Sequence, residues 1–259
     1  MKKIIVFVFG LFCFFSFAEI NKVEVLNEIT KKYENVSEIS GEIEIKMDMM
    51  GKTMTMPMKF WAKEKKFKME TVYQEPGMEK PMEIVMLMDG EKLIQYQKSI
   101  NTVIKFDLTK FPEELKKDWE KQYNFKDNIP LDIEKISNNV DLEIKNKGGK
   151  EYYVLTINNL QTLNIPGLQN INGKSQFFTK SVVWINRDNL LPESISYFAD
   201  KETPGMEIVF KSLNLSPINE DIFKINIPDD AKVLDMTDMM INMANTMKQQ
   251  ITTPQLNPY

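Results

Sequence analysis

The chain of 259 residues contains no histidine, one cysteine and one arginine. Without histidine, it has no serine–histidine or cysteine–histidine pair for nucleophilic catalysis and no imidazole ligand for a metal. It also has no G-x-S-x-G sequence. We therefore predict a protein that is not an enzyme and that needs no cofactor and no metal. A hydrolase built on paired carboxylates stays open as an alternative, because a sequence does not show which acidic side chains meet in space.

The first eighteen residues have the pattern of a secretory signal peptide. Lys2 and Lys3 form a positive start, residues 4–17 are almost entirely apolar, and Ser16 and Ala18 are the small residues before the expected cleavage. The apolar run is shorter than the ~20 residues of a membrane-spanning helix. We expect export to the periplasm and cleavage that leaves residues 19–259 as one soluble domain.

The mature chain is acidic and free of cysteine. Cys13 lies inside the leader, and the large Phe12 before it argues against lipid attachment. A chain of this length buries enough apolar surface to fold without disulfides. Without Lys2 and Lys3 the net charge of -4 becomes -6, so we predict no nucleic-acid partner. We expect a monomer.

Two helices are predicted before the tail. The first spans residues 21–36 and has lysine and glutamate on the face opposite its apolar stripe. The second spans 112–123, with proline in the first turn and acidic residues after it. The apolar stripe of the first helix consists of Val23, Leu26, Ile29 and Tyr33.

Apolar and polar side chains alternate over most of the remaining chain, as is typical of half-buried strands. Turn sequences at 51–52, 89–90 and 148–149 join several of these runs into hairpins. No strand–helix–strand repeat occurs, so we predict an antiparallel sheet. With this many strands such a sheet curls, and the predicted fold is mainly β, a single-domain unclosed antiparallel β-barrel with a helical lid. The predicted strands are 40–49, 53–62, 67–73, 82–88, 92–97, 102–108, 140–145, 152–157, 175–186, 193–198, 206–213 and 222–225.

Methionine takes the place of the usual core residues in the first hairpin and in a predicted C-terminal helix at 235–250. Asp235 or Thr237 is suited to cap that helix. The flexible, polarizable thioether adapts to apolar ligands of varying shape, so both clusters suit a cavity for acyl chains. Ordinary core packing explains the same pattern, and the sequence leaves both interpretations open. The predicted cavity residues are Met47, Met49, Met54, Met56, Met58, Phe60, Met69, Met86 and Trp184, and the predicted lid residues are Leu26, Ile29, Tyr33, Met239 and Met243.

The order of short motifs resembles the LolA/LolB-like family of bacterial outer-membrane lipoprotein carriers and sorting proteins. Glu64, Lys65 and Lys66 stand where the well-known carriers have an arginine that helps to hold the lid closed. The segments that carry the resemblance are YENVSEISG at 33–41, FWAKEKKFKM at 60–69, MDGEKLIQY at 88–96, VWIN at 183–186, LPESI at 191–195 and IFKINIPDDA at 222–231.

The resemblance implies a lidded, unclosed barrel with an apolar cavity for lipoprotein acyl chains, and no catalysis. It also implies an inner-membrane release complex and an outer-membrane acceptor as partners. We therefore expect an exported carrier that shuttles lipid or lipoprotein acyl chains across the cell envelope. A lipid-sensing or envelope-stress module of the same fold is the first alternative, and an envelope hydrolase is the second.

Overall fold

The computed structural model describes residues 21–49, 52–74, 80–117, 139–158, 178–199 and 202–252. The side chains of Met49 and of residues 247–252 lie outside this description, as does most of the predicted second helix. The first half of the sheet consists of β1 (Glu38–Met49), β2 (Lys52–Lys63), β3 (Lys66–Tyr73), β4 (Met82–Met88), β5 (Lys92–Gln97) and β6 (Thr102–Asp107). The second half consists of β7 (Val140–Lys147), β8 (Lys150–Asn158), β9 (Lys180–Asn186), β10 (Pro192–Phe198), β11 (Met206–Asn214) and β12 (Lys232–Asp235).

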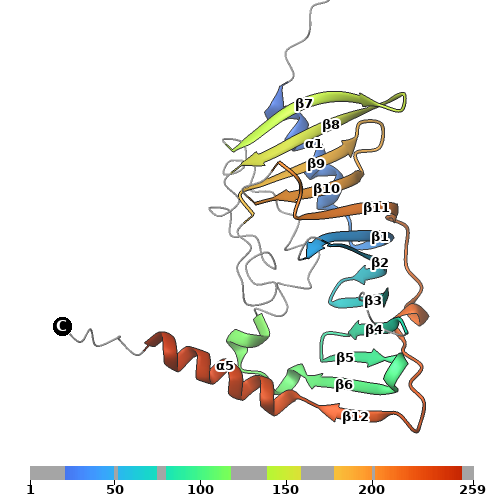
Figure 1. Cartoon of the computed structure of the whole chain (residues 1–259), viewed down its shortest axis with the longest axis vertical. Helices are drawn as coiled ribbons and strands as arrows, with labels where there is room; N and C mark the ends of the chain where they lie inside the picture. Colours follow the sequence, from blue (N-terminus) through green and yellow to red (C-terminus); the bar gives the residue numbers. More distant parts are fainter. Residues whose placement is uncertain are drawn as a thin grey trace, which may run out of the picture.

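These twelve strands form one sheet in the order β12-β6-β5-β4-β3-β2-β1-β11-β10-β9-β8-β7 (Figure 1). The edge strands β12 and β7 do not pair with each other, so the predicted unclosed barrel is confirmed. The prediction of a wholly antiparallel sheet is wrong at one edge, because β12 pairs with β6 in parallel. Strand β12 was not predicted, because its four residues show no alternation of buried and exposed side chains.

Helix α1 (Lys22–Glu34) packs on the face of the sheet that carries Ile45 and Met47, which we call the inner face. The Asn21 side chain caps the helix by accepting a hydrogen bond from the Glu24 amide. The buried side chains of the helix are Val25, Leu26 and Ile29, and they contact strand residues that include Val140, Tyr153, Leu155 and Met206. Val23, which was predicted on this stripe, is 49% exposed, because the buried stripe runs through Val25 instead.

Tyr33 fixes the end of α1 to the turn between β9 and β10. Its hydroxyl donates a hydrogen bond of 3.0 Å to the Leu190 carbonyl. Burial raises the pKa of Tyr33 to about 12, so the hydroxyl keeps its proton at neutral pH and remains a donor. Leu26, Ile29 and Tyr33 therefore hold α1 against the sheet, and their role as lid residues stays a prediction.

Segment 215–231, between β11 and β12, covers part of the opposite face, which we call the outer face. Ile218 and Phe223 form a buried cluster there with Leu87, a residue of β4. The predicted strand at 222–225 is wrong, because this stretch begins inside the 3₁₀ turn η4 (Glu220–Phe223). The Asn219 side chain accepts the Asp221 amide and stabilises the turn.

Helix α5 (Thr237–Thr252) follows β12 and extends away from the sheet (Figure 1). The Asp235 carboxylate accepts the Thr237 amide at 3.1 Å, as one of the two predicted caps. The Thr237 hydroxyl accepts the Asp107 amide at 2.9 Å, which ties the start of the helix to the end of β6. Among the described residues, no helix is both long enough and apolar enough to cross a membrane.

Candidate functional site on the inner face of the sheet

The strand register places the predicted methionines of the first hairpin on one face. Met47 pairs with Met54, and Ile45 pairs with Met56. Because side chains alternate between the two faces of a strand, Met54, Met56, Met58 and Phe60 share the inner face with Met47. On the neighbouring strands, Met69 lies opposite Phe60 and Met86 lies opposite Met69. The structure therefore brings together eight of the nine predicted cavity positions, with Met49 placed by register alone.

Trp184 is the exception and lies on the outer face. It pairs with Ser194, which pairs with Val209, which in turn pairs with Glu44. Glu44 is one residue away from Ile45 and so points to the opposite side of the sheet. The prediction that Trp184 faces the cavity is wrong because the strand was placed one residue out of phase. Its indole packs edge to face with Tyr152, with 5.7 Å between the ring centroids.

At both ends of the inner face, buried side chains from other elements pack against the sheet. At one end, α1 covers a cluster that reaches Ile45 and Met47. At the other end, the cluster around Met88, Leu93, Leu108 and Phe111 packs against Met86 and against Met240 and Ile241 of α5. Phe60 belongs to a third cluster, with Val36, Ile39 and Ala62.

The predicted lid contact of Met239 and Met243 is corrected by this arrangement. Met239 is 47% exposed and Met243 is 46% exposed. Met240 and Ile241, on a neighbouring stripe of the same helix, make the contact with the sheet side instead. The methionines of the predicted helix at 235–250 have helical spacing, which indicated an apolar face. This spacing did not show which side chains of that broad face pack against the sheet.

Between the filled ends lies a row of methionines that we call the methionine strip, made of Met54, Met56, Met58 and Met69. All four are half-buried. In the described parts of the chain, none of them belongs to any of the four clusters of buried side chains. Within the described residues, the strip is therefore an apolar surface that packs against none of these clusters.

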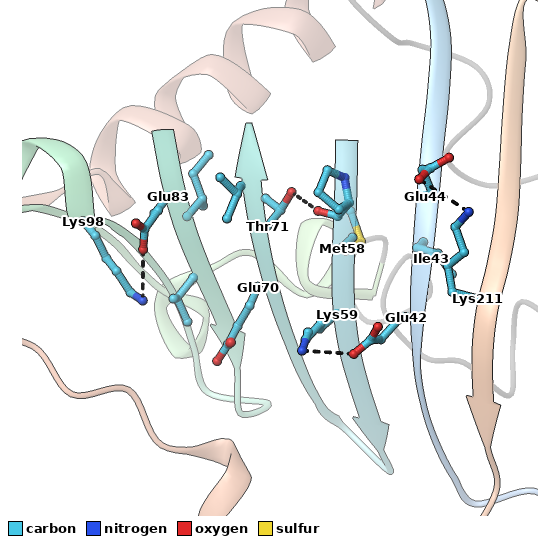
Figure 2. A pocket seen from close by; sticks show the side chains of 14 residues that line it. Glu42, Ile43, Glu44, Met58, Lys59, Glu70, Thr71, Glu83, Lys98 and Lys211 are labelled. Carbon is cyan, nitrogen blue, oxygen red and sulfur yellow. Dashed lines mark hydrogen bonds and ion pairs between the residues drawn. The ribbon is translucent and has the colours of Figure 1, made fainter. Parts of the chain in front are cut away.

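A pocket of about 280 Å³ opens across β1–β4, and its charged lining residues lie on the outer face (Figure 2). Its lysines are all paired. Lys59 meets Glu42 at 3.0 Å, Lys98 meets Glu83 at 3.5 Å, and Lys211 meets Glu44 at 3.5 Å. Met58 of the strip also lines this pocket, but an acyl chain there would lie among exposed ion pairs, so the pocket is a less apolar site than the rest of the methionine strip.

The β2–β3 ladder ends at the strip. Its last pair is Met58 with Thr71, and the next residue of β2 is Pro57, which has no amide hydrogen. The Thr71 hydroxyl donates to the Pro57 carbonyl at 2.7 Å and closes the ladder with a side chain (Figure 2). This threonine was not among the predicted site residues.

The described residues contain no group of three or more Asp, Glu, His or Cys side chains placed to hold a metal ion. On the outer face, the acidic side chains are held by neighbouring lysines and backbone amides. Lys63 and Lys66 lower the pKa of Glu220 to about 2, at 2.8 Å and 2.5 Å. The Ile218 amide lowers the pKa of Glu38. These contacts fasten segment 215–231 to the sheet.

No family model and no curated protein matches the chain. Among solved structures, it is similar to an uncharacterized conserved protein from Thermus thermophilus, with 11% identity and a TM-score of 0.46 over 82% of this chain and 99% of that one. It is similar to the lipoprotein LppX from Mycobacterium tuberculosis, with 9% identity and a TM-score of 0.41 over 76% and 96%. It is also similar to a LolA superfamily protein from Nitrosomonas europaea, with 13% identity and a TM-score of 0.29 over 77% and 97%.

Proposed function

We propose that this chain is an exported carrier that binds the acyl chains of a lipid or lipoprotein on the inner face of its sheet. The observation that carries the proposal is the methionine strip, four half-buried thioether side chains that belong to no core cluster in the described residues. Methionine adapts its three rotatable bonds to a flexible partner, and a chain of methylene groups is such a partner.

The energy scale suits a carrier. Removing a chain of about sixteen carbons from water stabilises the bound state by roughly 12 kcal/mol, at ~0.8 kcal/mol per methylene. A bilayer offers the same chain a similar gain. The net preference between protein and membrane is then small, which allows loading at one membrane and release at another.

The two helices give the site its borders. Leu26, Ile29 and Tyr33 hold α1 against β7–β11, and Met240 holds α5 against the cluster beside Met86. In the proposed function these helices are the lid of the site, and an inner-membrane release complex and an outer-membrane acceptor are the partners. The carrier acts in the periplasm as a monomer after its leader, residues 1–18, is removed.

The proposal is tested by native mass spectrometry of the mature protein, followed by organic extraction of any bound lipid. We expect lipid to co-purify with the wild type and to be lost from the Met54→Asp/Met56→Asp variant. The matched control is Thr53→Asp/Thr55→Asp, which places the same charges on the same strand but on the outer face. We expect the control to keep its lipid.

Transfer between membranes is measured separately, with donor and acceptor vesicles and a fluorescent acyl lipid. A carrier speeds transfer in proportion to its concentration. Protein that is free of lipid and does not bind the fluorescent lipid would overturn the proposal. Binding without transfer would favour a lipid-sensing module of the same fold.

A further inference from the structure

The two faces of β1–β6 differ in charge. Glutamate and lysine side chains of these strands gather on the outer face, where they form ion pairs such as Lys59–Glu42 and Lys98–Glu83. On the inner face of these six strands, all of which the structure describes, the register places one charged residue, Lys52, at the tip of the first hairpin. A ligand carboxylate at the β5 side of this face, away from Lys52, would be buried without a cationic partner among the described residues of β1–β6.

Two glutamines interrupt the apolar inner face at β5. Gln95 lies between Met86 and Ile104 on the neighbouring strands. Gln97 lies on the same face, two residues further along the strand. Both are half-buried, and in the described parts of the chain no side-chain hydrogen bond to either amide is present.

The inner-face hydroxyl groups near these amides already donate hydrogen bonds to backbone carbonyls. Thr71 donates to the Pro57 carbonyl at 2.7 Å, and Thr102 donates to the Ile100 carbonyl at 3.0 Å. Among the described polar side chains of this part of the inner face, Gln95 and Gln97 therefore keep hydrogen-bond donors and acceptors that are available to a ligand. An amide offers both functions without a charge, because its NH₂ donates and its carbonyl accepts.

The distance from the glutamines across the strip matches an acyl chain. From β5 to β2 the sheet spans three interstrand spacings, or about 14 Å at ~4.8 Å each. A single acyl layer of a bilayer is about 15 Å thick, half of the ~30 Å hydrocarbon core. A chain that begins at Gln95 or Gln97 and crosses β4 and β3 therefore ends over β2, where the register places Phe60 and Met58 in line with the two glutamines, and its polar end lies at β5.

We propose that Gln95 and Gln97 bind the neutral ester or amide linkage of an acylated ligand, so that the site selects linked acyl chains over free fatty acids. This inference rests on the proposed function and names its ligand class. The glutamine NH₂ groups donate to the linkage carbonyl. The glutamine carbonyls accept from an adjacent N–H or hydroxyl. An ionised fatty acid gains less, since its carboxylate needs a cation that the strip does not supply.

The test compares two probes that share a fluorescent sixteen-carbon chain, the free acid and its glycerol monoester, at pH 8. We expect the wild type to bind the monoester about tenfold more tightly, the effect of one to two net hydrogen bonds. Gln95→Leu/Gln97→Leu should weaken monoester binding about tenfold and leave the free acid unchanged. Gln97→Lys should strengthen binding of the free acid.

The control variant is Gln74→Leu, which makes the same change at an exposed position after β3. We expect it to bind both probes as the wild type does. Circular dichroism melting curves of all variants show whether the fold is kept. Equal binding of both probes by the wild type overturns the linkage assignment and leaves the carrier proposal standing. A preference that survives Gln95→Leu/Gln97→Leu overturns the role of the two glutamines, and binding of neither probe overturns both proposals.

Discussion

Replacing Leu26 by alanine should loosen α1 from the sheet and destabilise the whole domain. Leu26 is 1% exposed and lies in the largest buried cluster, with Val140 and Leu155 beneath it. The change removes three carbons, or roughly 2.4 kcal/mol at ~0.8 kcal/mol per methylene, and leaves a cavity that adds to the cost. We expect a loss of about 3–4 kcal/mol in the free energy of unfolding. For a chain of this size that corresponds to a fall in Tm of about 10 °C.

The assay is urea denaturation followed by circular dichroism, with thermal unfolding as a second measurement. The matched control is Val23→Ala, three residues earlier in the same helix and 49% exposed. Alanine has the higher helix propensity, so we expect the control to change stability by less than about 0.5 kcal/mol. Equal effects of the two substitutions would refute the placement of α1 on the sheet, because the argument depends on the difference in their burial.

Three further predictions concern the central strands, the outer face and α5. Gly41→Ala should destabilise the fold by about 1–3 kcal/mol, measured by urea denaturation, because the new Cβ would lie 2.4 Å from the Ser212 carbonyl oxygen. Because the pKa of Glu220 is lowered, its ion pairs stabilise the fold above pH 4.5, and this contribution is lost as the pH falls toward about 2. Glu220→Gln should therefore flatten the dependence of the free energy of unfolding on pH over that range. An unchanged dependence would contradict the assignment. Met240→Ser should lower Tm by several degrees, whereas Met239→Ser should leave it nearly unchanged in the same thermal scan, since Met240 packs and Met239 is exposed.

The strand content and the open barrel followed from the sequence because side chains on strands repeat with a period of two. The alternation of methionine with threonine and lysine in β2 fixed both the strand and its inner face. Gly90 takes a φ of 93° in the turn before β5, which explains why Asp89-Gly90 marked that turn correctly.

The errors arose where contacts between distant parts of the chain determine the face, the pairing or the role of a residue. Trp184 was assigned to the wrong face because β9 contains four consecutive apolar residues, Val182 to Ile185, and such a run does not define a phase. Strand β12 was missed because its pairing partner, β6, lies 130 residues earlier in the chain. Gln95 and Gln97 carried no signal as site residues until the register placed them on the inner face, with β4 between them and the strip.

The most direct test of the account is photo-crosslinking with an acyl ester that carries a diazirine in its chain, followed by peptide mapping of the mature protein. The account predicts labels on inner-face positions of β1–β4, with Met56, Met58 and Met69 labelled and Thr55 and Lys59 unlabelled. This alternation would show that the chain lies on the methionine strip. Labels concentrated around the outer-face pocket at Glu42 and Glu70, or no saturable labelling, would contradict the account.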